Sequence, residues 1–532
     1  MKLVTPAEMR SLDERTIEEF KVPGPLLMER AGWGAIQALQ RHLQPGRRRV
    51  DVFCGSGNNG GDGYVMARYL RLLGHKVRVW HVGDPRKLTP DCAFNRKRVQ
   101  REKIDIRDCP TASDLPTLDE LDGSVAIDAL LGTGSQGAPR DPVATAIRLI
   151  NSMQAFRLAV DIPSGVSGRD GSVAEDLAVE ADLTVTFGLP KVGQLLYPGK
   201  AYVGRLQIVD IGLASRAVDE LPTPARAALD EVAVGLLPER DPRGFKTTFG
   251  KLAIFAGSAG LSGAAILAGR AALRVGTGLV CLAGPRSQVP TFTLGSPECA
   301  KRGLPEVRRL ECLSTRALGD VMALLKEYPI SAIGPGLGRH HETMELVRRL
   351  LPRLPASAVL DADGLYALKG QPALLKDLPH SIILTPHPGE FATIFGGTAT
   401  EVAAAPIESA LRAAAETGQI ILLKGAPSVL ALPGGEYWLN GHGNDGMATG
   451  GSGDVLTGCI GGFLAQEMAA PEAALLGMIV HSMAGDRAAE RLGRRGMVAG
   501  DIVRALPRVM MELEAFEPLP ELPERFEAEV MG

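Results

Sequence analysis

The sequence lacks the features that would point to a membrane, to nucleic acid or to a structural zinc ion. No uncharged apolar run reaches membrane-spanning length. Basic residues are not in excess, because 58 Lys and Arg against 61 Asp and Glu give a net charge of −3. Nucleic acid is therefore not an expected partner. The seven cysteines are scattered, odd in number and form no CxxC pair, which indicates reduced thiols and no structural zinc.

The N-terminus is charged and lacks an apolar core, so we expect no signal peptide. Together with the reduced thiols, this predicts a soluble cytoplasmic protein that does not bind membranes. At 532 residues, 45% of them apolar, the chain is long enough for about two to four domains with full cores. A Pro-rich, charged stretch over residues 213–248 separates two halves. We place one domain at residues 1–220, a second at 225–515 and a tail at 516–532.

The first half begins with two predicted helices, over residues 7–20 and 25–42, and continues into a βαβ unit. The first strand of this unit covers residues 49–54 and its helix starts at Tyr64. The Gly-rich loop between them, residues 55–63, departs from the usual GxGxxG pattern because it contains two asparagines and an aspartate. Amide oxygens coordinate hard cations or hydrogen-bond polar ligands. A plain turn would not require them, so we interpret this loop as functional.

Two further apolar strands of the first half end in polar residues. Asp128 lies in a strand that runs into the Gly-rich loop 132–138, and Asp161 and Ser164 follow the next strand. The carboxyl ends of parallel strands meet at one edge of a sheet, so these side chains should lie together with Asn59. A single aspartate after a strand is often only a loop cap, but two aspartates beside an asparagine favour a ligand site. Oxygen ligands without His or Cys point to a hard ion such as K⁺ or Mg²⁺.

The second half repeats the strand–loop–helix pattern and predicts another doubly wound α/β domain. Polar loops end successive apolar strands, and a predicted hairpin over residues 429–440 leads into the last loop. These loops cover residues 257–264, 334–338, 361–365, 385–390, 424–428 and 444–454.

The last of these loops, residues 444–454, is the most informative stretch of the chain. It contains four glycines and two hydroxyl residues and runs into an apolar segment, 455–464, that is predicted to form a buried helix. A Gly-rich loop at a helix N-terminus leaves backbone N–H groups free at the positive end of the helix dipole, which suits phosphate. Asp454 would repel a phosphate, so we interpret it as a base or as a polar contact for a second ligand. The alternative is that Asp454 is a helix N-cap.

Three side chains keep two interpretations each. His387 lies between prolines at the exit of a strand, beside Glu390, and either binds a ligand or is structural. Lys424 directly follows an apolar strand and either neutralises phosphate or is the solvated end of that strand. Lys191 either reaches an anion or lies exposed at the surface.

Taken together, these motifs resemble a known family in both halves. The loop with Asn58 and Asn59, the strand-end Asp128 with loop 132–138, and residues 160–165 look like an NAD(P)HX epimerase domain. The loops 334–338, 361–365, 385–390 and 444–454, with Lys424 and Gly425, look like a ribokinase-like NAD(P)HX dehydratase domain. In this order the two halves resemble the bifunctional NAD(P)H-hydrate repair family, from the N-terminal helices to about residue 512.

The resemblance implies an α/β protein of two doubly wound domains. The first would be a Rossmann-like three-layer αβα sandwich and the second a ribokinase-like domain. The implied activities are epimerisation of R- and S-NAD(P)HX, an isomerase reaction, and ADP-dependent dehydration of S-NAD(P)HX to NAD(P)H, a lyase reaction. The implied partners are NADHX or NADPHX and ADP, and we expect a homo-oligomer.

A rival hypothesis is a ribokinase-like kinase of small vitamin precursors with a non-catalytic N-terminal binding module. Residues 385–390 favour the dehydratase over the kinase. The presence of Asn59, Asp128 and Asp161 favours a catalytic first domain.

The resemblance also implies roles for individual residues. K⁺ would be held by Asn59, Asp128 and Ser164, with Mg²⁺ as a second cation, and the acid/base candidates are Asp161 and Asp454. In the first domain the hydrate would contact Asp161 and also Asn58, Asn59, Gly60, Gly61, Asp62, Gly132, Thr133, Gly134, Ser135, Gln136, Gly137 and Ala138. In the second domain it would contact Ala264, Gly336, His387 and Asp454. ADP would contact Lys424, Gly425, Ala426, Pro427, Ser428, Asn444, Asp445, Gly446, Met447, Ala448, Thr449, Gly450, Gly451, Ser452 and Gly453.

Overall fold

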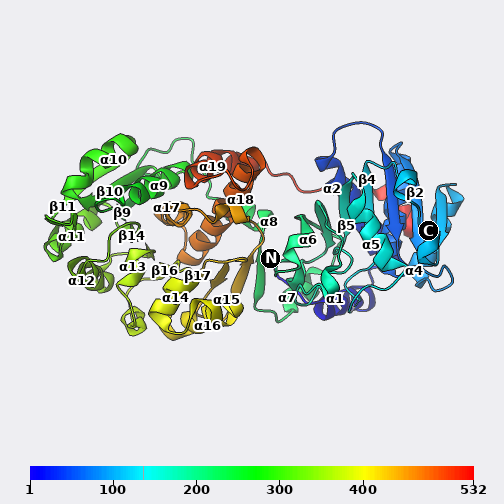
Figure 1. Ribbon diagram of the computed structural model, residues 1–532, viewed down its shortest axis with the longest axis horizontal. Coiled ribbons are helices and arrows are strands. Elements are labelled where there is room, and N and C mark those ends of the chain that lie inside the picture. The colour runs from blue at the N-terminus through cyan, green and yellow to red at the C-terminus, as the bar shows by residue number, and fades with distance from the viewer. Residues whose placement is uncertain (136, 532) are drawn as a thin grey trace. The chain divides into compact units, whose positions relative to one another are not determined.

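The computed structural model describes residues 1–135 and 137–531, with the side chains of the last four of these left out. The chain divides into two compact units, whose elements are labelled in Figure 1. The first unit comprises Lys2–Thr223 together with the C-terminal segment from Glu517 onward. The second unit comprises Met1 and Pro224–Phe516.

The first unit is built on a seven-stranded sheet in the order β3-β2-β1-β4-β5-β6-β7. Every neighbouring pair is parallel. This is the strand order of a Rossmann fold with one strand added, so the carboxyl ends of β1 and β4 flank the point where the order reverses. The strands are β1 (Arg49–Cys54), β2 (Lys76–Val82), β3 (Asp105–Cys109), β4 (Val125–Ala129), β5 (Phe156–Val160), β6 (Leu183–Phe187) and β7 (Arg205–Val209).

Both faces of this sheet carry a core, because side chains of a strand alternate between its faces. Val52 packs into one apolar cluster with α2 and α3, whereas its neighbour Phe53 packs into another with α5. The three-layer α/β prediction is thus confirmed for this unit. Its helices are α1 (Pro6–Glu18), α2 (Gly24–His42), α3 (Asn58–Leu72), α4 (Pro90–Arg101), α5 (Val143–Ser152), α6 (Lys200–Val203) and α7 (Ser215–Glu220).

Helix α3 begins six residues earlier than the sequence predicts, at Asn58 rather than Tyr64. The glycines at its start therefore serve close packing and not a loop. A Cβ on Gly60 would lie 2.0 Å from the carbonyl oxygen of Gly55, and one on Gly63 would lie 2.6 Å from the Cβ of Ala129. Only glycine lets the helix approach the sheet this closely.

The C-terminal segment belongs to the first unit and ends in α20 (Glu524–Met531). Phe526 is 8% exposed and packs against Trp33 of α2 and Tyr69 of α3. Arg30 and Glu527 form an ion pair at 2.7 Å. The residues that the sequence analysis leaves as a tail are thus part of the apolar core around α2.

The second unit contains a ten-stranded sheet in the order β11-β10-β9-β14-β15-β16-β17-β18-β19-β8. Only β18 runs antiparallel to its neighbours, and β18 with β19 forms the predicted hairpin. Two short strands, β12 (Glu306–Val307) and β13 (Cys312–Leu313), pair separately. The ten strands are β8 (Ala225–Ala228), β9 (Lys251–Phe255), β10 (Leu279–Pro285), β11 (Ala300–Leu304), β14 (Ile330–Ile333), β15 (Ala358–Leu360), β16 (Ile382–Leu384), β17 (Ile420–Leu423), β18 (Val429–Ala431) and β19 (Tyr437–Asn440).

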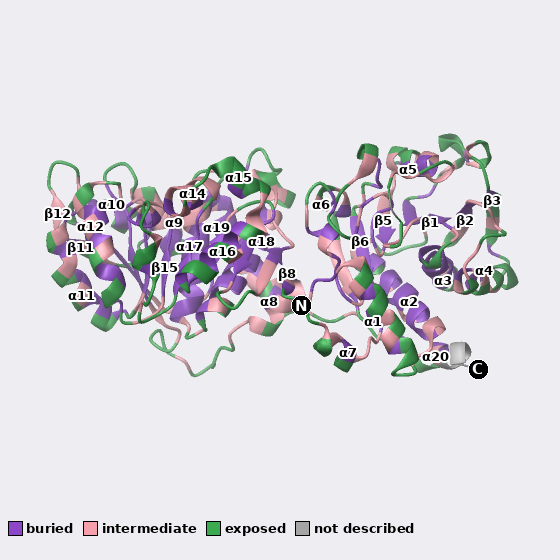
Figure 2. Ribbon diagram, turned by 90° about the horizontal axis from the view of Figure 1, so that it is seen from below, coloured by how far each residue is buried: buried purple, intermediate pink, exposed green. Residues whose placement is uncertain are grey.

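Helices pack on this sheet around α17, which contacts β14, β15, α9 and α18 and is almost entirely buried (Figure 2). The second unit is therefore also α/β, as predicted. Its helices are α8 (Asp230–Leu236), α9 (Ser262–Arg274), α10 (Val289–Gly295), α11 (Leu318–Glu327), α12 (His341–Leu350), α13 (Asp363–Tyr366), α14 (Pro388–Phe395), α15 (Ala399–Ala404), α16 (Pro406–Thr417), α17 (Ser452–Ala465), α18 (Ala470–Leu492) and α19 (Ala499–Glu514).

All seven cysteines are free and buried. Within the described part of the chain, none of the helices combines the length and the apolar character that crossing a bilayer requires.

Candidate functional site

In the first unit, the three residues predicted to hold a cation lie together. Ser164 donates from its backbone N–H and from its hydroxyl to the Asp128 carboxylate, at 2.8 and 2.6 Å. The Asn59 side-chain amide donates to the carbonyl oxygen of Leu131, and the Leu131 N–H donates to the Ser164 hydroxyl. The carboxyl ends of β4 and β5 and the start of α3 thus converge on Leu131.

This cluster has the donor set of a hard-cation site. The side-chain oxygen of Asn59 is buried and has no hydrogen-bond partner, although buried polar atoms are rarely left unpaired. Burial raises the pKa of Asp128 to about 6, so a bound cation would favour its charged form. The oxygens of Asn59, Asp128 and Ser164 are of the kind that hard cations take as ligands.

Asp161 stands directly after β5 and is paired with a lysine. Its backbone adopts φ +65, in the left-handed region. Lys191 Nζ lies 2.6 Å from Asp161 Oδ1 and also donates to the Thr186 hydroxyl. The Lys191 side chain is only 1% exposed, so its interpretation as a surface lysine was wrong.

Two further carboxyl groups lie near this pair. Burial raises the pKa of Asp62 well above its usual range, and the charges of Asp161 and Asp13 act in the same direction. Burial also raises the pKa of Asp13, in α1, to about 6. Asp13 gives no signal in the sequence, because it is an aspartate within an amphipathic helix. The first unit therefore gathers three carboxyl groups around one buried ammonium.

The predicted hydrate loop follows β4. Gly132 lies beside Asn59, since a Cβ there would be 3.3 Å from the Asn59 Cβ. Ser135 donates to the carbonyl oxygen of Gly132 and is exposed. Gln136 lies outside the described residues. The loop begins beside Asn59 and is exposed at Gly134 and Ser135.

In the second unit, a second lysine–aspartate pair lies at the carboxyl ends of the parallel strands. Lys424, directly after β17, places its Nζ 2.9 Å from Asp361 Oδ1 and 3.6 Å from Glu390 Oε2. Asp361, directly after β15, accepts a second hydrogen bond at Oδ2 from the Thr457 hydroxyl, at 2.7 Å. Lys424 is therefore a paired, largely buried ammonium and not the solvated end of its strand.

Helix α17 begins at the predicted phosphate loop. Its N-cap is Gly451, with φ +93, and Asp454 is the third residue of the helix. The N-cap interpretation of Asp454 was therefore wrong. Burial, together with the negative charge of Asp361, raises the pKa of Asp454 to about 7.

The predicted nucleotide loops meet at the Lys424 ammonium. A Cβ on Gly453 would lie 3.3 Å from Lys424 Nζ, so residues 424–428 and the end of loop 444–453 are adjacent. Asn444 donates to Asp486 at 2.8 Å, and the Ser452 hydroxyl lies 3.3 Å from the His481 ring. These contacts fix both ends of the loop.

Two of the predicted hydrate contacts of the second unit lie close to each other. Gly336 has φ +61, and a Cβ there would lie 3.2 Å from the Ala264 Cβ. Ala264 and Gly336 are therefore in close approach at the start of α9.

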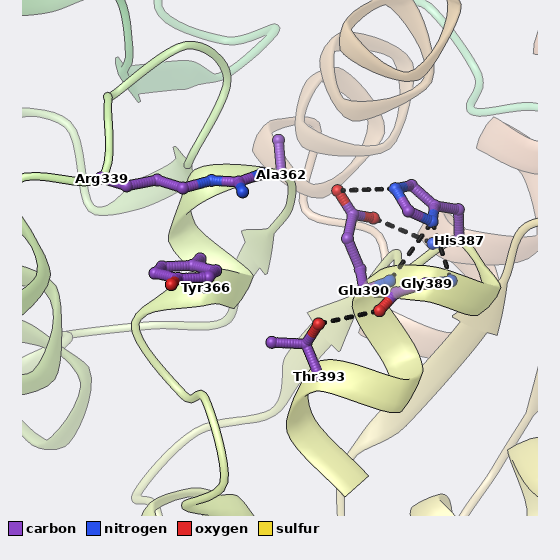
Figure 3. Close-up of a pocket in the computed structure, with 7 residues that line it drawn as sticks. All are labelled: Arg339, Ala362, Tyr366, His387, Gly389, Glu390 and Thr393. Carbon is purple, nitrogen blue, oxygen red and sulfur yellow. Dashed lines mark hydrogen bonds and ion pairs between the residues drawn. The ribbon is translucent and has the colours of Figure 1, made fainter. Parts of the chain in front are cut away.

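His387 has a structural role and also lines a pocket of about 290 Å³ with Glu390 (Figure 3). Its Nδ1 accepts hydrogen bonds from the backbone N–H groups of Gly389 and Glu390 and so caps α14. With Nδ1 held as an acceptor, the neutral ring carries its proton on Nε2. The Nε2 atom faces the Glu390 carboxylate at 3.5 Å, and it can donate a hydrogen bond to this carboxylate or to a ligand. The other residues that line the pocket are Arg339, Ala362, Tyr366, Gly389 and Thr393.

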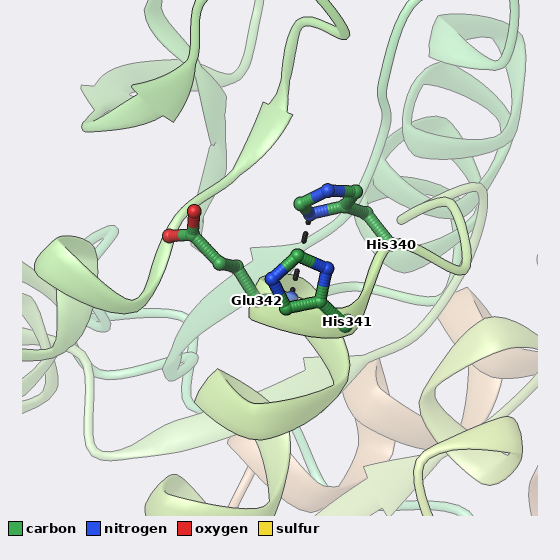
Figure 4. A group of neighbouring side chains, drawn as sticks. All are labelled: His340, His341 and Glu342. Carbon is green, nitrogen blue, oxygen red and sulfur yellow. Dashed lines mark hydrogen bonds between the residues drawn. The ribbon is translucent and has the colours of Figure 1, made fainter.

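A separate group of His340, His341 and Glu342 stands at the start of α12 (Figure 4). His340 is the helix N-cap, and its ring accepts from the Glu342 N–H. Glu342 accepts two hydrogen bonds from Thr315. These contacts account for the group as helix capping, and the positive end of the helix dipole disfavours a cation there.

Family models match both halves of the chain. Residues 25–193 match the model described as YjeF-related protein N-terminus, and residues 252–508 match the model described as NAD(P)H-hydrate dehydratase. The two matches fall on the first and second units in the order that the sequence resemblance predicts.

Relatives extend the match to nearly the full length. The chain is 39% identical over 518 residues to a bifunctional NAD(P)H-hydrate repair enzyme of Moorella thermoacetica, with 97% of each chain covered. It is 33% identical over 484 residues to the Escherichia coli enzyme of the same name, with 91% of this chain and 89% of the relative covered.

Among solved structures, an ADP/ATP-dependent NAD(P)H-hydrate dehydratase from Bacillus subtilis, co-crystallised with ATP/Mg²⁺, is 30% identical. It covers 54% of this chain, 98% of its own chain is matched, and the TM-score is 0.48. With relatives at 33–39% identity along nearly the whole sequence, the chain belongs to the bifunctional NAD(P)H-hydrate repair enzyme family.

Proposed function

We propose that this protein repairs NADH and NADPH hydrated on the nicotinamide ring. The first unit interconverts the R and S hydrates, and the second removes water from the S hydrate with ADP as co-substrate. The observation that carries the proposal is a lysine–aspartate pair at the carboxyl ends of the parallel strands in each unit. Asp161 is part of the first pair, and Asp454 lies close to the second.

In the first unit, Asp161 is the proposed acid/base group. Proton transfer by a well-placed group contributes about 10²- to 10⁴-fold to a rate. The substrate is proposed to approach along the first turns of α3, at Asn58–Asp62, and along the loop that follows β4. Asn59, Asp128 and Ser164 would hold K⁺, which would supply positive charge for oxygens of the substrate.

In the second unit, Asp454 is the proposed group that transfers a proton at the substrate hydroxyl. The hydroxyl is on the carbon next to the ring nitrogen. As the C–O bond breaks, its electrons leave with oxygen, and the nitrogen lone pair forms a C=N⁺ bond. Loss of a proton from the neighbouring carbon returns an electron pair to the ring and completes NAD(P)H. His387 binds the hydrate through its Nε2–H, because its Nδ1 is engaged in capping.

The nucleotide is assigned to residues 424–428 and 444–453. Free N–H groups at the start of α17 and the Lys424 ammonium suit its phosphates. These residues would hold ADP with Mg²⁺, which would supply a phosphate group to the reaction. Ala264 and Gly336 leave room for the hydrate where larger side chains would not.

Two variants test the division of labour. The Asp161→Asn variant should dehydrate pure S hydrate and leave R hydrate unchanged. The Asp454→Asn variant should equilibrate R and S hydrates but form no NAD(P)H, with a loss of about 10²-fold or more. Chromatographic measurement of R, S and NAD(P)H in both variants decides between the outcomes. Full dehydration by Asp454→Asn would overturn the assignment of the second site.

A further inference from the structure

Asp361 is buried between Lys424 and helix α17 in the second unit. It is not among the predicted nucleotide or hydrate contacts. It is 1% exposed. Its two carboxylate oxygens are used by different partners, Lys424 at 2.9 Å and the Thr457 hydroxyl at 2.7 Å. A buried carboxylate that is fully paired on both oxygens is held in one orientation.

Asp361 also lies close to Asp454. Gly453 directly precedes Asp454, and a Cβ on Gly453 would lie 3.8 Å from Asp361 Oδ2. Thr457, which donates to Asp361, is one turn beyond Asp454 on the same face of α17. The hydrogen bond from Thr457 therefore fixes α17, and with it Asp454, against the end of β15.

The backbone that follows Asp361 makes an unusual turn at Ala362. Ala362 adopts φ +49, a conformation that alanine rarely takes. The next residue, Asp363, pairs with Arg339 at 2.8 Å and accepts from the Gly338 N–H. The strained turn at Ala362 thus lies between two aspartates that contact different neighbours. Strained backbone of this kind is typical of functional sites.

We propose that Asp361 is a positioning residue of the dehydration reaction, which fixes the Lys424 ammonium by direct pairing and places a buried negative charge beside Asp454. The inference rests on the proposed function of the second unit and adds a residue that acts through two others. A charge at this position matters because burial makes electrostatic interactions stronger than in water.

The charged groups around Asp454 determine the direction of the effect. Asp361, Asp363 and Glu390 raise its pKa, and Lys424 lowers it. From α18, His481 faces the nearby Ser452, and burial lowers the pKa of His481 to about 4, so it is neutral at pH 7. Loss of the Asp361 charge should therefore lower the pKa of Asp454, and loss of the Lys424 charge should raise it.

The test is the pH dependence of kcat/KM for S hydrate in wild type, Asp361→Asn and Lys424→Met. In the wild type, the pH profile of kcat/KM should have a limb near pH 7. This limb should move to lower pH in Asp361→Asn and to higher pH in Lys424→Met. A shift of about one pH unit or more corresponds to a tenfold change in the protonation equilibrium. If Asp361 and Lys424 only supported the fold, their substitutions would change the rate without moving the limb to lower pH in one variant and to higher pH in the other.

Two controls keep the result interpretable. Thr457→Val removes the hydrogen bond to Asp361 but keeps its charge, so its limb should stay within a few tenths of a pH unit of the wild type. Asp361→Glu restores the charge and should return the limb toward the wild-type position even where its rate is low. If Asp361→Asn does not fold, Asp361→Ser removes the same charge in its place.

The outcomes separate this inference from the proposed function. A wild type that forms no NAD(P)H from S hydrate contradicts the proposed function itself. A wild type that is active, with a limb that stays in place in Asp361→Asn, overturns the role of Asp361 alone.

Discussion

The Lys191 ammonium and the Asp161 carboxylate lie 2.6 Å apart in the first unit, with Lys191 almost completely buried. Lys424 and Asp361 form a similar pair in the second unit at 2.9 Å, in which the carboxylate is the more buried partner, at 1% exposed. A buried ammonium requires a partner, since an unpaired charge in the interior is strongly destabilising. Both sites therefore hold a preorganised pair of opposite charges at the carboxyl ends of a parallel sheet.

Replacement of Lys191 by Met should remove most epimerase activity. Without the ammonium, Asp161 loses the donor that fixes it at 2.6 Å, and we expect a loss of about 10²-fold or more. The measurement is the rate at which pure R hydrate becomes a mixture of R and S. Dehydration of S hydrate by the same variant is the internal control and should be retained. Undiminished epimerisation would contradict the role of the pair.

The stability of the second unit should depend on pH through Asp454. Its pKa of about 7 in the folded protein is above the usual value near 4. The unfolded chain therefore loses this proton first as pH rises, and the contribution of Asp454 to stability, present below pH 4, is lost as pH approaches 7. Asp454→Asn cannot ionise, so its Tm relative to wild type should be higher at pH 8 than at pH 4.5. An equal difference at both pH values would show that Asp454 titrates normally.

Phe526 should contribute to the stability of the first unit although it lies near the C-terminus. It packs against Trp33 and Tyr69, so Phe526→Ala should destabilise this unit by about 3–5 kcal/mol. Leu72→Ala is the matched control, because Leu72 is 62% exposed in the same unit and should change the stability by at most about 0.5 kcal/mol. Denaturant unfolding monitored by tryptophan fluorescence gives both values. Equal effects of the two substitutions would show that the C-terminal segment is not part of this core.

Epimerisation should require a monovalent cation at the cluster of Asn59, Asp128 and Ser164. Asp128→Asn removes one negative oxygen and should weaken the apparent K⁺ affinity by about 10- to 100-fold. The epimerisation rate is measured against K⁺ concentration, with choline to keep the ionic strength constant. An epimerisation rate of the wild type that does not depend on K⁺ would contradict a role for the cation.

The sequence alone predicted the elements that carry strong patterns. The βαβ start, the parallel order with Asp128 and Asp161 at strand ends and the hairpin before loop 444–454 follow from apolar strands ending in polar loops. The same rule could have selected Asp361, because it too directly follows an apolar strand.

Other features depend on packing that no local pattern encodes. The glycines after Gly57 suggested a loop, but they form the first turns of α3 because the helix lies against β1 and β4. From the sequence, Lys191 and Lys424 could be either ligand contacts or exposed surface residues. Only the fold shows that each pairs with an aspartate distant in the sequence. Phe526 is separated by almost 500 residues from Trp33, so its place in the first unit could not be predicted from its neighbours.

The most direct test of the account is recovery of the reduced-nicotinamide absorbance from a mixture of R and S hydrates supplied with ADP. Controls contain ATP in place of ADP, or no nucleotide. If both units are active, the absorbance should recover completely with ADP, because the first unit converts R to S as the second consumes S. Recovery that stops at the S fraction would contradict the epimerase, and no recovery above the nucleotide-free control would contradict the dehydratase.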